Sequence, residues 1–215
     1  MKDRLSLVYS VLYKIYGPQK WWPADSVFEV IVGAILTQNT SWKNVERAIA
    51  NLKSSRNLSP ERLRKISIKK LASIIKPSGY HNVKAKRLKN FIKYLFKSYK
   101  GSLNRLFSQP IAAIRQGLLS VNGIGPETAD SIILYAAKKP VFVIDAYTKR
   151  ILFRCGIIKY DLPYEQIQAV FHKNLPMNAA LFNEYHALIV EHGKNVCKTK
   201  PLCCKCALRA CCAGE

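Results

Sequence analysis

Helical periodicity runs through almost the whole of this 215-residue chain, and no long segment alternates between apolar and polar residues. Apolar residues recur three and four positions apart, which is the spacing of the buried stripe of a helix. Residues 141–144 are rich in β-branched and aromatic side chains, but four residues are too few to imply a sheet. The sequence therefore predicts an all-α fold.

Local signals locate the individual helices. Ser26 and Glu29 have the spacing of a capping box at the start of a strongly apolar segment. Ser59 followed by Pro60 is typical of an N-cap and the first helical position. Residues 77–79 (Pro-Ser-Gly) mark a break. The remaining helices are expected at 42–53, 82–98, 109–117, 126–138, 146–155, 163–174 and 178–192.

Positive charge dominates the composition. Lysine and arginine number 35 against 13 acidic residues, so the formal net charge is +22. Such a balance favours a polyanionic partner. The expected helix at 82–98 shows the same bias, since one side is apolar (Leu88, Phe91, Ile92, Leu95 and Phe96) and the other is basic (Lys84, Lys86, Arg87, Lys89 and Lys93).

The N-terminal segment carries charges among its apolar residues. A helix over residues 1–17 would place Leu5, Val8, Val11, Leu12 and Ile15 on one side. This pattern predicts an amphipathic helix and lacks the uninterrupted apolar run of a signal peptide. The chain has no apolar run near the roughly 20 residues that span a bilayer. We therefore expect a reducing, cytoplasmic location and no membrane partner.

Cysteine is concentrated at the C-terminus, where six of the seven cysteines lie within the last 19 residues. Four thiolates on one tight loop can hold a metal ion or an iron–sulfur cluster, and the spacing alone does not distinguish zinc from iron–sulfur. A disulfide framework is the competing interpretation, although adjacent Cys-Cys pairs and the absence of a secretion signal argue against it. The remaining Cys155 is interpreted as a small core residue.

A glycine-containing turn over residues 118–130 is the most informative local motif. A short helix is expected to end at Asn122, two glycines (Gly123 and Gly125) permit a tight reversal, and Pro126 begins the next helix. Backbone N–H groups from Gly123 to Glu127 would then point outward at a helix N-terminus. Such an arrangement suits a phosphate group of a nucleic-acid backbone.

Asp145 directly follows the apolar segment 141–144. An acidic residue in this position is commonly a helix N-cap, and taken alone Asp145 is more readily interpreted as a cap than as a catalyst. The two roles are compatible, because a carboxylate fixed by capping is preorganised for chemistry.

Together these motifs resemble the helix-hairpin-helix DNA glycosylases of the endonuclease III superfamily, most of all the 3-methyladenine branch. The resemblance covers nearly the whole chain. It rests on residues 36–40 (Leu-Thr-Gln-Asn-Thr), 77–80 (Pro-Ser-Gly-Tyr), the glycine hairpin, Asp145, residues 186–193 and the C-terminal cysteines. It implies two helical domains flanking a DNA-binding cleft. Their expected bounds are 26–138 for a six-helix domain with the hairpin, and 1–25 plus 139–215 for the second domain.

The resemblance also implies a reaction, in which the enzyme flips a damaged base out of double-stranded DNA and cuts its N-glycosidic bond. Asp145 matches the essential aspartate of the family. Bifunctional members carry a hairpin lysine that forms a Schiff base, and Glu127 occupies that position here. The expected enzyme is therefore monofunctional, although another lysine such as Lys149 could substitute.

The substrate implied by the resemblance is an alkylated purine such as 3-methyladenine. Tandem tryptophans, Trp21 and Trp22, together with Phe28 and Glu127, match the base pocket of that branch. Indole faces attract a flat cation by about 0.5–2 kcal/mol. The competing interpretation is that the tryptophans only close the core. Some enzymes of that branch lack the cysteine loop, so oxidised pyrimidines or mismatched thymine and uracil remain the alternative substrates.

The resemblance assigns further contacts. Gln38 aligns with the residue that fills the space left by the flipped base. The remaining expected DNA contacts come from Asn39, Gly123, Gly125, Thr128 and Lys149. The cysteine loop implies a 4Fe-4S cluster on Cys197, Cys203, Cys206 and Cys212. The family's first gap is six residues, whereas Cys203 gives five; Cys204 would restore six but leave only one before Cys206.

Two other functional classes fit parts of the pattern. A non-catalytic DNA-damage-binding module would use the hairpin and the positive charge equally well. A structural zinc protein would use the cysteines. A monomer is expected, located in the cytoplasm and, in a prokaryote, associated with the nucleoid.

Overall fold

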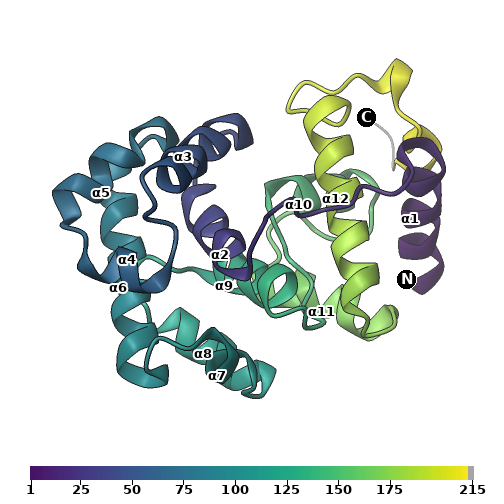
Figure 1. Cartoon of the computed structure of the whole chain (residues 1–215). Helices are drawn as coiled ribbons and strands as arrows, with labels where there is room; N and C mark the ends of the chain where they lie inside the picture. The colour runs from purple at the N-terminus through teal and green to yellow at the C-terminus, as the bar shows by residue number, and fades with distance from the viewer. Residues whose placement is uncertain (213–215) are drawn as a thin grey trace. The chain divides into compact units, whose positions relative to one another are not determined.

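The computed structural model describes residues 1–212, which form helices joined by loops and contain no β-strand (Figure 1). The all-α prediction is confirmed. Residues 141–144 are buried and form a connection between helices rather than a strand. None of the helices in this range combines the length and apolar character that a bilayer crossing requires.

The chain divides into two compact units, Ala24–Ala137 and a discontinuous unit of Met1–Pro23 with Lys138–Glu215. Their bounds differ by one or two residues from the expected domains at 26–138 and at 1–25 plus 139–215. The assignment of these segments to a six-helix domain and a second helical domain stays a prediction.

The continuous unit is arranged around one apolar helix, α2 (Val27–Leu36), which is buried from Phe28 to Leu36 and packs against α3, α6, α9 and η2 (Figure 1). The elements around it are α3 (Trp42–Ser54), α4 (Pro60–Lys65), α5 (Ile68–Ile74), η1 (Lys76–Ser78), α6 (His81–Tyr99), α7 (Leu103–Phe107), α8 (Ile111–Leu119), α9 (Pro126–Ser131) and the π-helical turn η2 (Ile132–Ala136).

The helix caps predicted from the sequence at Ser26 and Ser59 are present in the structure. The Ser26 hydroxyl accepts a hydrogen bond from the N–H of Glu29 at 3.1 Å. The Glu29 carboxylate accepts from the N–H of Asp25 at 3.0 Å, one residue before the usual capping-box position, and also pairs with Lys53 at 2.7 Å. Ser59 caps α4, with Pro60 at its start.

The discontinuous unit joins the N-terminal helix α1 (Lys2–Tyr16) to the C-terminal part of the chain. It contains α10 (Ala146–Arg154), α11 (Tyr164–Asn174), α12 (Ala179–Asn195) and the short 3-10 turns Cys203–Lys205 and Arg209–Cys211. Helix α12 packs against both α1 and α10. The buried Tyr185 hydroxyl of α12 donates to the carbonyl of Leu5 in α1 at 2.8 Å, and Phe142 stacks on Phe171 in the core.

Several local predictions were wrong. Ile15 is 53% exposed and Phe96 is only partly buried, because each lies at the margin of its helix's apolar stripe. Helix α8 ends at Leu119 rather than at Asn122, since residues 120–123 form a turn. The segment 126–138 is an α-helix only to Ser131 and then widens into a π-helical turn.

The basic side expected on α6 is smaller than the sequence indicated. Lys84 is buried, and its ammonium group donates to the carbonyls of Leu36 at 2.9 Å and Ser78 at 2.6 Å. Lys89 is partly buried and donates to backbone carbonyls at the end of α4. These lysines serve as internal donors because the ends of neighbouring helices leave carbonyl groups that need partners.

Candidate active site

The glycine hairpin lies between α8 and α9 in the continuous unit. Gly123 has a φ of 94°, and a Cβ atom there would come 2.3 Å from Cγ of Arg87. Glycine is therefore required at this position, both for the backbone conformation and for the close approach of Arg87. Gly125 has ordinary backbone geometry and open space around its Cα. The Asn122 carbonyl accepts from the Asn90 side chain of α6 at 3.0 Å, so α6 supports the turn.

Gln38 connects the end of α2 to this hairpin. Its amide nitrogen donates to the Gly123 carbonyl at 3.1 Å and to the Thr128 hydroxyl at 2.8 Å. Its amide oxygen accepts a hydrogen bond from the Arg87 guanidinium. The sequence did not single out Arg87 for this role, because its contact with Gln38 spans 49 positions along the chain.

The other predicted residues of this unit differ in exposure. Asn39 is exposed and has a positive φ of 53°, and Glu127 is exposed in the first turn of α9. Thr128 and Phe28 are buried. The Thr128 hydroxyl accepts a hydrogen bond from Gln38, so this side chain links the end of α2 to α9.

Asp145 is the N-cap of α10. Its carboxylate accepts from the N–H of Thr148 at 2.7 Å, which confirms the capping role expected from the sequence. The other carboxylate oxygen lies 3.6 Å from Nε2 of His186 on α12. Burial lowers the pKa of His186, and the nearby Asp145 carboxylate opposes that shift. The capping bond holds the Asp145 carboxylate in one orientation. The side chain is 13% exposed, so part of it stays accessible to solvent.

The other predicted residues of the discontinuous unit are partly exposed. Trp21 and Trp22 contact each other edge to face, with ring centroids 5.7 Å apart. The Lys149 ammonium lies 5.0 Å from the ring centroid of Tyr160. Of the four residues expected in a base pocket, Trp21 and Trp22 belong to this unit, whereas Phe28 and Glu127 belong to the continuous one.

The C-terminal cysteines form a loop that α10 holds in place. Arg150 donates to the carbonyls of Cys197 at 2.8 Å and Gly193 at 2.9 Å. Arg154 donates to the carbonyls of Lys198 and Thr199 and lies 3.2 Å from the Cys197 sulfur. Neither arginine was identified from the sequence. Their spacing of four positions on one helix places both on the same side, which could have indicated a shared partner.

The C-terminal cysteine side chains are near enough to influence one another electrostatically, but within residues 1–212 they are not assembled as a metal site. All seven described cysteines are free, and Cys155 is buried, as expected of a core residue. Burial raises the pKa of both Cys206 and Cys212, and their neighbours Cys197 and Cys203 raise it further. The four expected ligands therefore lie within electrostatic reach of one another, whereas Cys204 is exposed. Within residues 1–212, no three potential ligands are close enough together to hold a single metal ion.

Comparison with known proteins assigns the chain to a family. Residues 32–177 match HhH-GPD, described as the HhH-GPD superfamily base excision DNA repair protein. The chain belongs to the HhH-GPD superfamily. It is thus a DNA glycosylase, an enzyme that hydrolyses N-glycosidic bonds in base excision repair.

Individual relatives of this HhH-GPD protein cover nearly its full length. A Methanocaldococcus jannaschii protein named "Putative DNA repair glycosylase" is 48% identical over 210 residues, which cover 97% of this chain and 95% of the relative. Endonuclease III of Sulfolobus acidocaldarius is 29% identical over 189 residues, covering 87% and 82% of the two chains.

Solved structures show the same fold. The H. pylori 3-methyladenine DNA glycosylase MagIII, bound to 1,N6-ethenoadenine, matches with a TM-score of 0.77 and 30% identity, covering 90% of this chain and 96% of that one. A non-covalent endonuclease III–DNA complex matches with a TM-score of 0.85 over 99% and 95% of the two chains, at 19% identity.

Proposed function

We propose that this HhH-GPD protein is a monofunctional DNA glycosylase that removes an alkylated purine such as 3-methyladenine from double-stranded DNA. The observation that carries the proposal is the Asp145 carboxylate, which is fixed by the first turn of α10 and by its proximity to His186. The 30% identity to an enzyme named for 3-methyladenine supports the choice of substrate.

The fixed carboxylate suits hydrolysis at the deoxyribose. As the bond between C1′ and the base nitrogen breaks, its electron pair leaves with the base and positive charge builds on the sugar. A carboxylate beside C1′ stabilises that charge. The oxygen of a water molecule then bonds to C1′, and Asp145 accepts the proton that the water releases. Because 3-methyladenine is cationic before cleavage, it leaves as a neutral base and needs no protonating acid.

Glu127 supports the monofunctional part of the proposal. A lysine in the hairpin could attack C1′ and form an imine, but a carboxylate cannot. Glu127 is exposed in the first turn of α9, the position at which the resemblance places that lysine. Lys149 is the alternative amine, and its contact with Tyr160 gives it a local structural role.

DNA recognition follows from the hairpin and the base-binding residues. The backbone N–H groups at the start of α9, from Gly125 onward, would bind a strand phosphate. Gln38 and Asn39 would contact the position opposite the flipped base. Expected stacking partners for that base are Trp21 and Trp22, which are partly exposed.

The four thiols Cys197, Cys203, Cys206 and Cys212 would hold a 4Fe-4S cluster. Cluster binding would stabilise the loop by joining its four cysteines, of which only the segment around Cys197 is already held against α10 by Arg150 and Arg154. We assign the cluster this structural role. The expected cytoplasmic, nucleoid-associated location stays a prediction.

A substrate panel tests the proposal. Duplexes containing 3-methyladenine or a stable analogue, an oxidised pyrimidine, or mismatched thymine or uracil would be incubated with enzyme, and alkali would reveal abasic sites. We expect cleavage at the alkylpurine after alkali, and no covalent enzyme–DNA complex when borohydride is present. Release of only the pyrimidines would assign the enzyme to the alternative substrates, and a borohydride-trapped complex would refute the monofunctional mechanism.

A further inference from the structure

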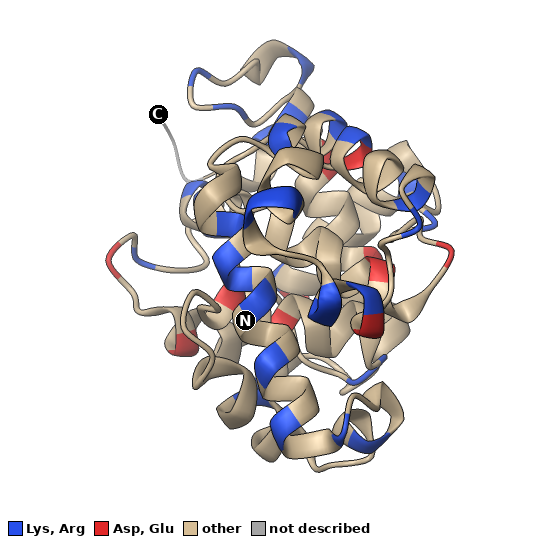
Figure 2. Cartoon of the chain, turned by 60° about the vertical axis from the view of Figure 1, so that its left-hand side comes forward, with Lys and Arg blue, Asp and Glu red and all other residues tan. Residues whose placement is uncertain are grey.

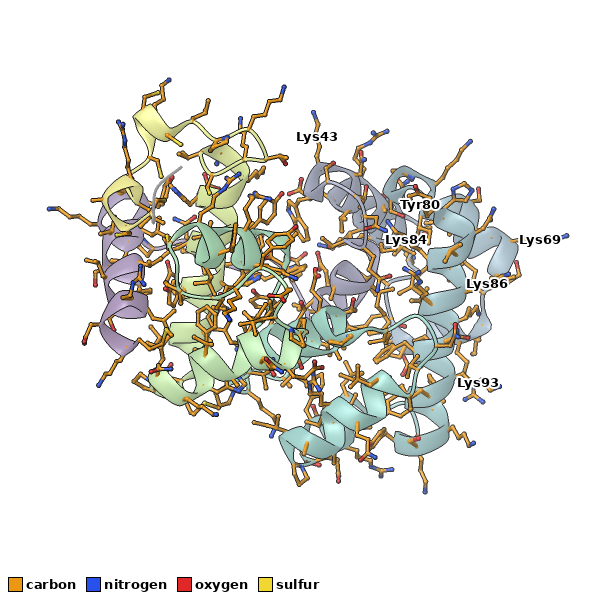
Figure 3. The ribbon with its side chains drawn as sticks, turned by 180° about the vertical axis from the view of Figure 1, so that it is seen from behind. Lys43, Lys69, Tyr80, Lys84, Lys86 and Lys93 are labelled. Atoms are coloured by element: carbon orange, nitrogen blue, oxygen red, sulfur yellow. The ribbon has the colours of Figure 1, made fainter. Side chains whose placement is uncertain are left out.

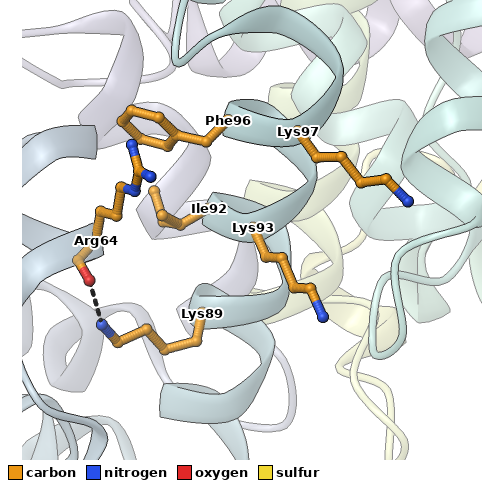
Figure 4. A pocket seen from close by; sticks show the side chains of 6 residues that line it. All are labelled: Arg64, Lys89, Ile92, Lys93, Phe96 and Lys97. Atoms are coloured by element: carbon orange, nitrogen blue, oxygen red, sulfur yellow. Dashed lines mark hydrogen bonds between the residues drawn. The ribbon is translucent and has the colours of Figure 1, made fainter.

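A second feature of the continuous unit is a pocket beside α6 that none of the candidate active-site residues lines. A pocket of about 390 Å³ opens between α4 and α6 (Figure 4). Its lining consists of four cationic and two apolar side chains: Arg64, Lys89, Ile92, Lys93, Phe96 and Lys97. This volume is within the range of small-ligand sites in proteins.

The pocket has an apolar floor with cations on both sides. Ile92 is buried and Phe96 partly exposed, and the Arg64 guanidinium lies over the Phe96 ring, 4.4 Å from its centroid. Lys93 and Lys97 are exposed and extend from α6 on the opposite side of this floor (Figure 4). An anionic chain with apolar parts between its charges would match this pattern.

Lys89 has a different role from the other three cations. Its ammonium group donates to the carbonyls of Leu63 and Arg64 and to that of Ile66, so it is held against the end of α4. Burial lowers the pKa of Lys89. The charges available to a ligand are therefore those of Arg64, Lys93 and Lys97.

The pocket continues a basic stripe on the helix that also supports the hairpin. Lys86, Lys93 and Lys97 follow one side of α6, and Lys86 and Lys93 are seen along it in Figure 3. Eleven residues of helix correspond to about 16 Å, which is several phosphate spacings along a DNA strand. Asn90, on the same helix, contacts the hairpin carbonyl of Asn122. The stripe and the hairpin are thus rigidly connected within one unit.

We infer that this pocket is a second DNA-backbone site, in which Arg64, held in place over Phe96, and the exposed Lys93 and Lys97 bind neighbouring phosphates of one strand. An acidic peptide is disfavoured, because the lysines extend about 16 Å along one side of a straight helix, which suits the continuous row of phosphates of a DNA strand. The inference rests on DNA being the ligand in the proposed function, but not on the identity of the lesion.

The test measures binding to an undamaged duplex as a function of salt. Arg64→Gln, Lys93→Gln and Lys97→Gln would be combined in one variant. The matched control removes three exposed charges from the other unit, through Lys2→Gln, Lys14→Gln and Lys159→Gln. Each lost phosphate contact reduces the slope of log K against log salt by about 0.9. We expect the magnitude of the slope to be smaller by about two to three in the pocket variant and nearly unchanged in the control variant.

A second measurement does not depend on the variants. Lysine acetylation of the wild-type protein, with and without the duplex, should show Lys93 and Lys97 protected by DNA. Equal salt slopes for the pocket variant and the control variant would overturn the inference, and so would lysines that DNA does not protect from acetylation. Binding of a glutamate-rich peptide by these cations, together with an unchanged salt slope for DNA, would also overturn it. The rate of base release at saturating DNA should be the same in the pocket variant and the wild type. Failure of the proposed function would appear differently, as a wild-type protein that binds DNA but releases no base.

Discussion

The Asp145 carboxylate has a structural role in addition to the catalytic role proposed for it. One oxygen accepts the N–H of Thr148 and so begins α10, while the other faces His186 and remains partly accessible. Because the capping bond fixes the side chain, the charge needs no reorganisation when the sugar becomes cationic. The local structural role thus supports the proposed chemical one.

The variant Asp145→Asn separates these roles. Asparagine is as good an N-cap as aspartate, so α10 should be retained. The loss of the negative charge should reduce the rate of base release by a factor of about 10² to 10³ or more, with affinity for damaged duplex preserved. Single-turnover kinetics and a binding titration check this. A variant that keeps the wild-type rate would remove Asp145 from the mechanism.

Lys84 is a second residue whose burial has a measurable consequence. Replacing it with methionine deprives the Leu36 and Ser78 carbonyls of a shared donor. Loss of such a donor costs about 1–3 kcal/mol in the free energy of unfolding. Urea denaturation measures this cost, and Lys86→Met, on the exposed side of the same helix, is the control with no comparable loss expected.

The difference in stability between the wild type and Lys84→Met should depend on pH. Burial lowers the pKa of Lys84 from 10.5 to about 8. Between these values the unfolded chain binds the proton and the folded one does not, so the stability of the wild type rises with pH in that interval. The loss in free energy of unfolding caused by Lys84→Met should therefore be larger at about pH 9.5 than at about pH 7. An equal deficit at both pH values would contradict a lowered pKa.

At the scale of an element, the hairpin depends on one glycine more than on the other. Gly123 has a positive φ and lies against Arg87, whereas Gly125 has no positive φ and has space for a side chain. The two glycines look equivalent in the sequence, and only the packing of α6 beneath the turn distinguishes them.

Gly123→Ala and Gly125→Ala form a matched pair. The first should lower the free energy of unfolding by about 1–3 kcal/mol through backbone strain and should weaken DNA binding. The second should be close to the wild type in stability. Thermal unfolding and a duplex titration measure both effects, and equal behaviour of the two variants would contradict the geometry described for the turn.

The cysteine loop offers a similar comparison. Cys203→Ser should lose the brown colour and the content of about four irons per chain expected of the cluster, because it removes a proposed ligand. Cys204→Ser should keep both, because Cys204 is exposed. Iron analysis and visible absorption check the pair. The opposite pattern would move the ligand assignment to Cys204.

Much of the element-level description was accessible from the sequence. The caps at Ser26, Ser59 and Asp145 were identified because capping depends on residues within one turn. The burial of Lys84 and the link from Gln38 to Arg87 were not, because they depend on contacts between segments about 50 residues apart. Amphipathic patterns assign lysine to the solvent side and cannot indicate a lysine that satisfies a neighbouring helix end.

At the scale of the whole molecule, positive charge is distributed over both units. Lysines and arginines occur on helices throughout the chain, whereas acidic residues are few (Figure 2). A general excess of this size promotes association with DNA of any sequence and makes it sensitive to salt. It does not locate the contacts, which is why the pocket beside α6 could not be found from the composition.

The division of the chain has a consequence for its synthesis. Residues 24–137 form one continuous unit, whereas α1 packs on α12, a helix that begins at Ala179. On the ribosome, the continuous unit can acquire its core while the last third of the protein is still untranslated. Helix α1 is translated before α12, so its apolar stripe stays uncovered until α12 is made and Tyr185 can bond to the Leu5 carbonyl.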